Sequence, residues 1–308
     1  MKSMRISVHI PLYLKNNKEN KRLKNFNKVC NGFINLSSKT EVFVHCNKKV
    51  KSKSKKIKFI FHEFKENHPF KLTWFCRELM EKQKNDYDVF VYSEDDIFFS
   101  KKNLKYWLLH KDKCINNHYN LGFLRVEKNK KDNKLYSSDQ ITKSQYYVNL
   151  YKRRYFVLEN PYCAFWIYDK NEFSKFIKTK WWKFNWSLRS NSGILHIREM
   201  AAWGWHGINM NGVDMDRYLT TIVPLKKGKP DKNSYIRHLS DNYANSPMGL
   251  FGTFKIESIL SNKLKNFKPL TPLGKLLRRL KNVVYSTFRI NVKSFFKKTK
   301  LHSDLIKR

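Results

Sequence analysis

The sequence predicts an α/β fold in which a mixed sheet is flanked by helices. Two observations support this class. Strand-like segments rich in Val, Ile and aromatic residues alternate with segments whose apolar residues recur at helical spacing. In addition, the apolar run at 89–92 is continuous, as in a strand that is buried on both faces. Strands that alternate with helices are typical of a sheet covered by helices, so we expect one principal globular domain.

The first hundred residues contain six predicted elements in the order β-α-β-β-α-β. They are a strand at 5–14, a helix at 17–36, strands at 40–46 and 56–64, a helix at 68–84 and a strand at 89–92. The alternation of Ile57, Phe59 and Phe61 indicates that the third strand is more exposed than the others. Pro69 lies near the start of the second helix, where a missing N–H group is tolerated.

The second half of the chain contains shorter predicted elements. They are a helix at 104–115, a strand at 120–127, a hairpin at 147–160, a strand at 162–168, a helix at 171–178, a short helix at 197–204 and a strand at 219–225. Asp169 or Asn171 is expected to cap the helix at 171–178. The tryptophans at 181–186 either stack on a sugar ring or belong to the core or a lid hinge.

The charge balance is strongly basic, with 63 Lys and Arg against 25 Asp and Glu, a net charge of +38. This charge points to an anionic partner such as nucleic acid, a membrane surface or a phosphorylated substrate. Alternatively, an AT-rich coding sequence produces the abundance of Lys and Asn without any function. The five cysteines are scattered and form no Cys-x-x-Cys pair, which indicates a reducing compartment with neither disulfides nor a zinc site.

The location of the protein is predicted from its apolar segments. No apolar run approaches the ~20 residues of a membrane-spanning helix. The first residues lead into a strand and are too short for a signal peptide. We therefore expect a cytoplasmic protein, with peripheral contact to the inner face of a membrane as an open alternative.

The composition changes after Gly252, which divides the chain into a catalytic domain at 1–252 and a basic, partly helical tail at 253–308. From residue 255 onwards, 15 Lys and Arg stand against two acids, a net charge of +13. Between residues 273 and 284, apolar residues at helical spacing lie opposite basic ones. This amphipathic helix either lies on an anionic membrane surface or packs on the protein with its basic face solvated.

Three consecutive carboxylates, Glu94, Asp95 and Asp96, follow the buried strand at 89–92. Three like charges beside an apolar core are unfavourable unless a cation binds them, and Mg²⁺ and Mn²⁺ prefer carboxylate oxygens. We therefore predict a metal site at the carboxyl end of this strand. The alternative is a turn whose acids merely begin the next helix.

The end of the first strand is expected to lie beside these acids, because ligands of open α/β sheets bind at the carboxyl ends of strands. His9, Pro11 and Tyr13 are the residues predicted to contact the ligand there. The sequence contains neither a P-loop nor Gly-x-Gly-x-x-Gly. Metal-assisted departure of a nucleoside diphosphate is the chemistry that fits these residues best.

The segment Tyr92-Ser93-Glu94-Asp95-Asp96 resembles the Asp-x-Asp element of GT-A-type nucleotide-sugar glycosyltransferases, in a variant Glu-Asp-Asp form. The β-α-β-β-α-β order before it is similar to the nucleotide-binding half of that family. The resemblance covers roughly residues 4–250 and implies a GT-A-like fold. It also implies that Glu94 and Asp96 coordinate Mn²⁺ or Mg²⁺ on the donor's diphosphate, with Asp95 reaching the ribose, the sugar or the metal.

Two further site residues are implied by this resemblance. His238 matches the histidine that completes the metal coordination in many members of the family. Glu199 matches the carboxylate base that inverting members place on a helix. The simpler alternatives are a structural histidine and a surface ion pair with Arg198 or a nearby lysine. Rival candidates for the base are Asp139, Asp214 and Asp216.

The combined expectation is a metal-dependent glycosyltransferase that moves a sugar from a nucleotide-sugar donor to a hydroxyl acceptor. Its expected setting is the assembly of a surface glycan such as lipopolysaccharide or capsule, with a glycan or glycolipid acceptor. The rival class is a metal-dependent nuclease or another basic nucleic-acid-binding protein. No helix-turn-helix, zinc-ligand set or RNA-binding aromatic signature is recognisable for that class. A third alternative is a peripheral membrane protein without activity at the acids.

Overall fold

A computed structural model of the chain describes residues 4–14, 20–49, 54–63, 71–179, 181–183, 197–204 and 220–267. Three of the predicted features therefore lie outside the described residues. They are the rival bases Asp214 and Asp216, most of the tryptophan-rich segment, and the amphipathic segment at 273–284.

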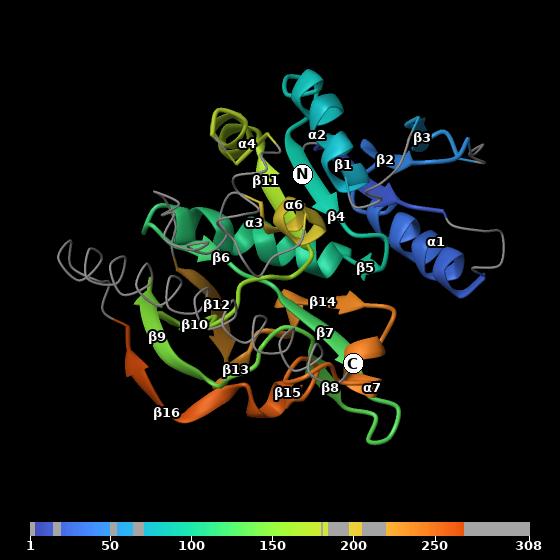
Figure 1. The fold of residues 1–308 in the computed structure, drawn as a ribbon. Coiled ribbons are helices and arrows are strands. Elements are labelled where there is room, and N and C mark those ends of the chain that lie inside the picture. The colour runs from blue at the N-terminus through green and yellow to red at the C-terminus, as the bar shows by residue number, and fades with distance from the viewer. Residues whose placement is uncertain are drawn as a thin grey trace, which may run out of the picture.

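The first sheet has five strands in the order β11-β4-β1-β2-β3 (Figure 1). Their bounds are β1 Ile6–Leu12, β2 Thr40–Cys46, β3 Ile57–Phe61, β4 Val89–Ser93 and β11 Phe165–Asp169. The first four strands are parallel and β11 is antiparallel to β4. The β-α-β-β-α-β prediction is confirmed, and β3 is the exposed edge strand that its alternating pattern indicated.

Helices cover both faces of this sheet, and each face has its own apolar core. The helices are α1 Asn20–Ile34, α2 Leu72–Lys82, α3 Lys101–Ile115, α4 Lys170–Phe176 and α6 Ile197–Trp203. Val89 and Val91 of β4 face the core shared with α1 and α3, whereas Phe90 and Tyr92 face the core shared with α2, α4 and α6. Because β4 is buried on both faces, it reads as a continuous apolar run.

The tryptophan pair at the start of the predicted cluster belongs to the second of these cores. Trp181 and Trp182 are 7% and 2% exposed, and their backbone carbonyls accept hydrogen bonds from Arg77. The core interpretation is therefore confirmed for these two residues. The helix α4 is capped by Asp169, whose side chain accepts a hydrogen bond from the backbone N–H of Glu172.

Two further sheets complete the described structure. One has the order β13-β12-β10-β9-β16, with β6 paired to β12, and the other has the order β15-β8-β7-β14-β5. Their bounds are β5 Ile97–Phe98, β6 Asn120–Leu121, β7 Leu124–Lys128, β8 Leu135–Ser137, β9 Ser144–Leu150, β10 Arg153–Val157, β12 Thr221–Lys226, β13 Lys229–Pro230, β14 Tyr235–His238, β15 Phe254–Lys255 and β16 Leu260–Asn266. The short helix α7 spans Asn242–Asn245, and the predicted hairpin is β9–β10.

The single strand predicted at 120–127 is wrong, because the chain forms two short strands that join different sheets. The break falls at Gly122, where a Cβ atom would lie 2.6 Å from the side chain of Thr221 and 2.7 Å from that of Leu158. Only glycine allows the chain to pass this close to its neighbours. Hydrophobic pattern alone does not reveal such a crossing between sheets.

The strands β15 and β16 follow the predicted domain boundary at residue 252. They pair with β8 and β9, so residues 254–266 extend sheets that begin earlier in the chain. All five cysteines are buried and unbridged. Within the described ranges, no helix is both long and apolar enough to cross a membrane.

Candidate active site

The acidic triplet lies at the carboxyl end of β4, as predicted, in the turn that leads into β5. The backbone of this turn is held on both sides. The N–H of Glu94 donates to the carbonyl of Ala164, 3.1 Å away, and the N–H of Leu239 donates to the carbonyl of Asp96, 2.9 Å away. Because β5 pairs with β14 so that Ile97 lies opposite His238, the sheet brings this distant histidine beside the acids.

The closest pairing in the site joins Asp96 to His238. The His238 Nε2 atom lies 2.9 Å from Asp96 Oδ2, which also accepts a hydrogen bond from the hydroxyl of Ser240. Burial acts to raise the pKa of Asp96, but the hydrogen bond and charge of His238 outweigh it and lower the pKa to about 2. Asp96 is therefore an anion at neutral pH.

Glu127 holds the other side of the His238 ring. Its carboxylate is fully buried and accepts from His238 Nδ1 through one oxygen and from the N–H of Ala244, 2.6 Å away, through the other. Burial acts to lower the pKa of His238, but the hydrogen bonds to Asp96 and Glu127 raise it to about 9. The ring orientation is thus fixed, with Nε2 directed at Asp96.

Glu127 is not recognisable as a site residue from the sequence. It lies on β7, where apolar and charged residues alternate in the order Leu-Arg-Val-Glu. This pattern is usual for a strand with one solvated face. In the fold both faces of β7 are covered, so Arg125 and Glu127 are buried, and only the packing reveals that these charges face inward.

Glu94 is a buried carboxylate with weak partners. The hydroxyl of Tyr162 lies 3.4 Å from Glu94 Oε1, and the Arg198 guanidinium lies 3.9 Å from the same oxygen. Burial raises the pKa of Glu94 to about 7, with Arg198 opposing the shift and Asp96 adding to it. A cation bound beside such a carboxylate stabilises its ionised form.

Asp95 is tied to the end of β1 through Arg22 of α1. The Arg22 side chain donates to Asp95 Oδ2 over 2.6 Å and to the carbonyl of Tyr13 over 2.8 Å. Burial raises the pKa of Asp95, and the charge of Asp96 adds to this shift while Arg22 opposes it. Arg22 thus links the backbone of Tyr13 to the acidic turn, and Pro11 is buried in β1 two residues earlier. Arg22 was not identified from the sequence, where it is one of many basic residues.

His9 is not part of this group. Its ring is fully buried on the sheet, where it is hydrogen-bonded to Ser7, Gln83 and His45, and His45 is bonded in turn to His62. Burial lowers the pKa of His9 to about 3, so the ring is neutral. The side chains of a strand alternate between its two faces, and the position of His9 places its ring under α2 instead of at the strand end.

Asp139 forms a buried ion pair. Both of its carboxylate oxygens accept from Arg125, one from Nε over 2.8 Å, and both side chains are at most 6% exposed. This bidentate pairing leaves no carboxylate oxygen directed at a substrate. The structure therefore gives Asp139 a structural role, in contrast to the predicted role as a base.

Glu199 lies on α6 and is partly exposed. Its neighbour on the helix, Arg198, lies 3.9 Å from Glu94 Oε1, which places this end of α6 beside the acidic turn. Trp203, on the same helix, packs against the Tyr162 ring with 5.3 Å between the ring centroids. Glu199 is thus the predicted base candidate that the fold places near the acidic turn.

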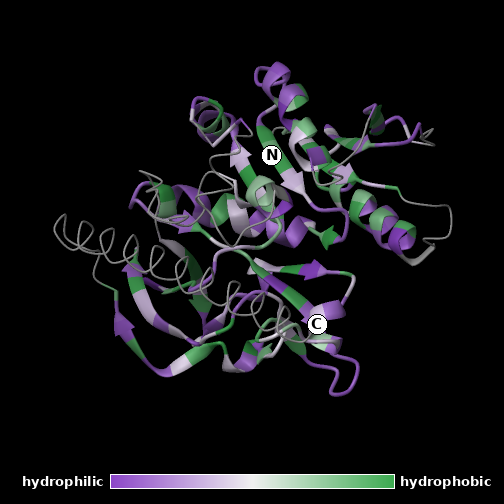
Figure 2. Cartoon of the chain, viewed as in Figure 1, coloured by the Kyte–Doolittle hydropathy of each residue, from purple (hydrophilic) through white to green (hydrophobic). Residues whose placement is uncertain are grey.

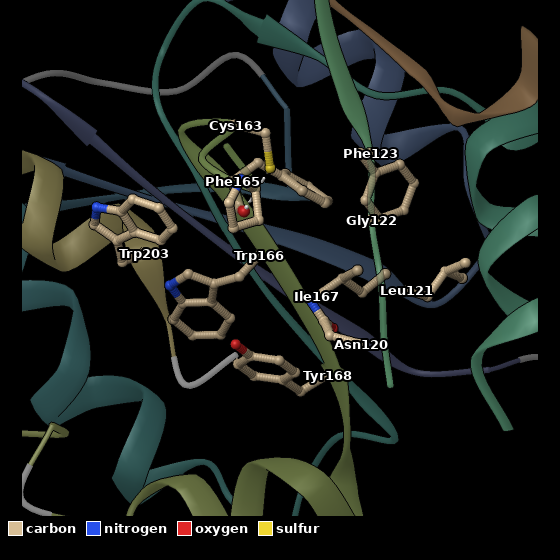
Figure 3. Close-up of a pocket in the computed structure, with 11 residues that line it drawn as sticks. Asn120, Leu121, Gly122, Phe123, Cys163, Phe165, Trp166, Ile167, Tyr168 and Trp203 are labelled. Atoms are coloured by element: carbon tan, nitrogen blue, oxygen red, sulfur yellow. Dashed lines mark hydrogen bonds between the residues drawn. The ribbon is translucent and has the colours of Figure 1, made fainter. Parts of the chain in front are cut away.

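A pocket lies next to this group, between β11 and residues 120–123 (Figure 3). Its walls contain several aromatic side chains, among them Trp166, Tyr168 and Trp203. Trp203 also contacts Tyr162, which in turn contacts Glu94. Tyr162 therefore links Trp203, in the wall of the pocket, to Glu94 of the acidic turn.

The carboxylate oxygens of the acidic turn are ligands that suit a hard divalent cation. In the described part of the chain, however, no three His, Cys, Asp or Glu side chains enclose a metal position. Mg²⁺ bound to phosphate ligands is commonly held by only one or two carboxylates, with substrate oxygens and water as the other ligands. Asp96 is ionised and Glu94 lies in the same turn. A metal-binding histidine usually donates its second N–H to a carboxylate, as His238 does to Glu127.

Replacing Glu94 by Gln is expected to stabilise the metal-free protein above pH 7. The folded-state pKa of about 7 exceeds the ordinary 4.5, so the folded protein holds this proton more tightly than the unfolded chain does. The wild type therefore loses stability as the pH rises from 4.5 to about 7, whereas Glu94→Gln does not. We expect a gain of about 3 kcal/mol above pH 7 and none below pH 4.5, measured by urea unfolding in EDTA. Equal stability of the two proteins at all pH values would contradict a raised pKa.

Comparisons with known proteins identify no family. No protein-family model matches the chain, and no curated protein matches it in sequence. Among the solved structures that match part of the chain, three illustrate how low the similarity is. The bifunctional IspDF from Campylobacter jejuni is 11% identical, with 59% of this chain and 45% of that chain covered and a TM-score of 0.30. TarS 1–349 from S. aureus is 16% identical, with 56% and 49% covered and a TM-score of 0.30.

The third structure is a glycosyltransferase involved in the glycosylation of the major capsid of PBCV-1. It is 13% identical, with 40% of this chain and 52% of that chain covered and a TM-score of 0.20. The chain spans about half the length of each of these proteins.

Proposed function

We propose that the protein is a metal-dependent glycosyltransferase that moves a sugar from a nucleotide-sugar donor to a hydroxyl acceptor. One observation carries this proposal. The buried strand β4 delivers Asp96 to the Nε2 atom of His238, whose ring is held from behind by the buried carboxylate of Glu127. An acid and an oriented imidazole at the carboxyl end of a central parallel strand form a suitable site for a metal-bound diphosphate.

In this proposal Asp96 and Glu94 would hold Mn²⁺ or Mg²⁺ together with phosphate oxygens of the bound donor and water, and His238 would join them once its Nε2 proton is displaced. When bound, the ion neutralises the negative charge that develops on the departing nucleoside diphosphate. Glu127 keeps Nε2 of His238 directed at the ion position and stabilises the ring. The Arg198 guanidinium, which is 45% exposed beside Glu94, supplies additional positive charge for the donor phosphates.

Asp95 and the end of β1 form the other side of the proposed donor site. Arg22 fixes one oxygen of Asp95, and the second oxygen is the one we assign to a hydroxyl of the donor's ribose or sugar. The Arg22 contact to the carbonyl of Tyr13 fixes the distance between the acidic turn and β1. Tyr13 and Pro11 are accordingly assigned to the wall of the donor site.

The direct test is a screen of nucleotide-sugars for hydrolysis and of nucleoside diphosphates for binding, each with Mn²⁺ and with EDTA. We expect at least one nucleoside diphosphate to raise the melting temperature only when Mn²⁺ is present. Thermal stabilisation by single-stranded oligonucleotides, with no response to any nucleoside diphosphate, would instead support the nucleic-acid-binding class.

We assign the role of the base to Glu199. Replacing it by Gln is expected to lower kcat about 100-fold or more, since a general base commonly contributes that much. The KM for the donor is expected to stay nearly unchanged, because Glu199 does not belong to the proposed metal ligands. A matched control is Glu257→Gln, which alters a surface glutamate paired with Lys134. An unchanged kcat in Glu199→Gln would remove this residue from the reaction.

A further inference from the structure

An exposed apolar turn follows α7 directly. In residues 246–252 the side chains of Met248, Leu250 and Phe251 are 62%, 60% and 37% exposed. The turn is tight, since the N–H of Phe251 donates to the carbonyl of Met248 over 3.2 Å and Gly249 adopts a φ of +62°. The three apolar side chains are therefore held on the surface by a defined backbone conformation.

This turn is anchored to the helix before it. A Cβ atom at Gly252, where φ is +79°, would lie 2.4 Å from the backbone of Tyr243. Only glycine allows the end of the turn to close onto α7 at this distance. We call residues 246–252 the apolar turn. The chain runs from His238 through α7 into it, so the apolar turn is linked to the candidate active site.

A set of exposed lysines lies beside the apolar turn. Lys128 ends β7, and the loop between β7 and β8, drawn in purple in Figure 2, contains Lys130 and Lys131. Asn245 binds this loop at two points, as it accepts from the N–H of Lys130 over 2.8 Å and donates to the carbonyl of Lys128 over 3.0 Å. In the described part of the chain, these three ammonium groups form no ion pair. Asn245, which directly precedes the apolar turn, therefore joins the turn to the segment that bears these lysines.

The charge of this surface decides what it can bind. A second copy of the chain carries a net charge of +38, and the tail from residue 268 on has 12 Lys and Arg against one acid. Both are repelled by the three lysines. A nucleic acid matches the charge but offers no apolar layer for Met248 and Leu250. An anionic lipid surface offers both negative headgroups and an apolar interior.

We propose that the apolar turn inserts into the interfacial layer of an anionic membrane, while Lys128, Lys130 and Lys131 contact the lipid headgroups. The buried apolar area and the attraction of the lysines act together, as in other peripheral proteins. This contact is independent of the transferase reaction and separate from the tail at 253–308. It would hold the candidate active site close to the membrane surface.

The test is co-sedimentation of the full chain with vesicles of phosphatidylcholine alone or mixed with phosphatidylglycerol. We expect wild type to bind the mixed vesicles. The double variant Met248→Ser/Leu250→Ser is expected to bind them about tenfold more weakly because two apolar side chains no longer insert. The triple variant Lys128→Gln/Lys130→Gln/Lys131→Gln is expected to weaken binding at least about tenfold, and less so at high salt.

Leu109→Ser is the matched control, because Leu109 is 58% exposed on α3, away from the apolar turn. All variants keep the tail, so its contribution to vesicle binding is the same in each. The proposal is supported if only the turn and lysine variants lose binding while their melting temperatures stay at the wild-type value. It is overturned if Met248→Ser/Leu250→Ser binds as wild type does, if Leu109→Ser loses as much, or if the turn variant instead converts a dimer to a monomer.

Discussion

Asp96→Asn is expected to abolish Mn²⁺-dependent binding of a nucleoside diphosphate and to lower transferase activity at least about 100-fold. The substitution keeps the shape of the side chain but removes the negative charge that a divalent ion requires. It also leaves a single oxygen to accept the hydrogen bonds that His238 and Ser240 now donate. Calorimetric titration with the diphosphate, in Mn²⁺ and in EDTA, measures the effect.

A matched control for Asp96→Asn is Asp88→Asn. Asp88 is a half-exposed carboxylate that pairs with Arg5 next to the amino end of β4, at the other end of the same strand. It should leave the Mn²⁺-dependent affinity unchanged. Because Asp96→Asn also loses the ion pair with His238, its melting temperature is measured in parallel and the titrations are done well below it. Wild-type affinity of Asp96→Asn for the diphosphate would remove Asp96 from the metal site.

Asp139→Asn is expected to lower the free energy of unfolding by about 3–5 kcal/mol. Arg125 is then left buried without its bidentate anionic partner, and a buried unpaired charge is strongly destabilising. Urea unfolding monitored by tryptophan fluorescence gives this value, with the same denaturant dependence expected for both proteins. This effect on stability separates Asp139 from Glu199, whose replacement is expected to affect kcat alone.

The double variant Arg125→Met/Asp139→Leu supplies the control for this ion pair. Replacing both charges by apolar side chains leaves no charge unpaired, so most of the lost stability should return. If Asp139→Asn instead unfolds like wild type and has lost its turnover, then Asp139 has the role of the base and the structural assignment is wrong.

The strands and helices of the first half of the chain could be predicted because their signals are local. The run Val89 to Tyr92 is apolar on both faces, and the apolar residues of α1 recur at helical spacing. Each such pattern depends on neighbours in sequence that share an element. The break at Gly122 could not be predicted in this way, because the close contacts that require glycine come from Thr221 and Leu158, which lie elsewhere in the chain.

The candidate site was only partly predictable for a related reason. The position of Glu94, Asp95 and Asp96 at a strand end is a local property of the sequence. Their partners are not local, since Glu127 and Arg22 come from β7 and α1 and carry no distinguishing pattern in a chain with so many charged residues. His9 was misplaced because the alternation of a strand directs its ring to a sheet face covered by α2.

Local composition was sufficient to establish an α/β chain with a buried strand that ends in three acids, because hydrophobic periodicity and turn residues act over a few positions. The packing of three sheets and their helices settled which charges meet: Asp96 with His238, His238 with Glu127, and Arg125 with Asp139. Buried charges must find partners of opposite sign in space, and the partner's place in the sequence does not affect that energy. For the same reason Asp139, a candidate base in the sequence, is paired with Arg125 in the core.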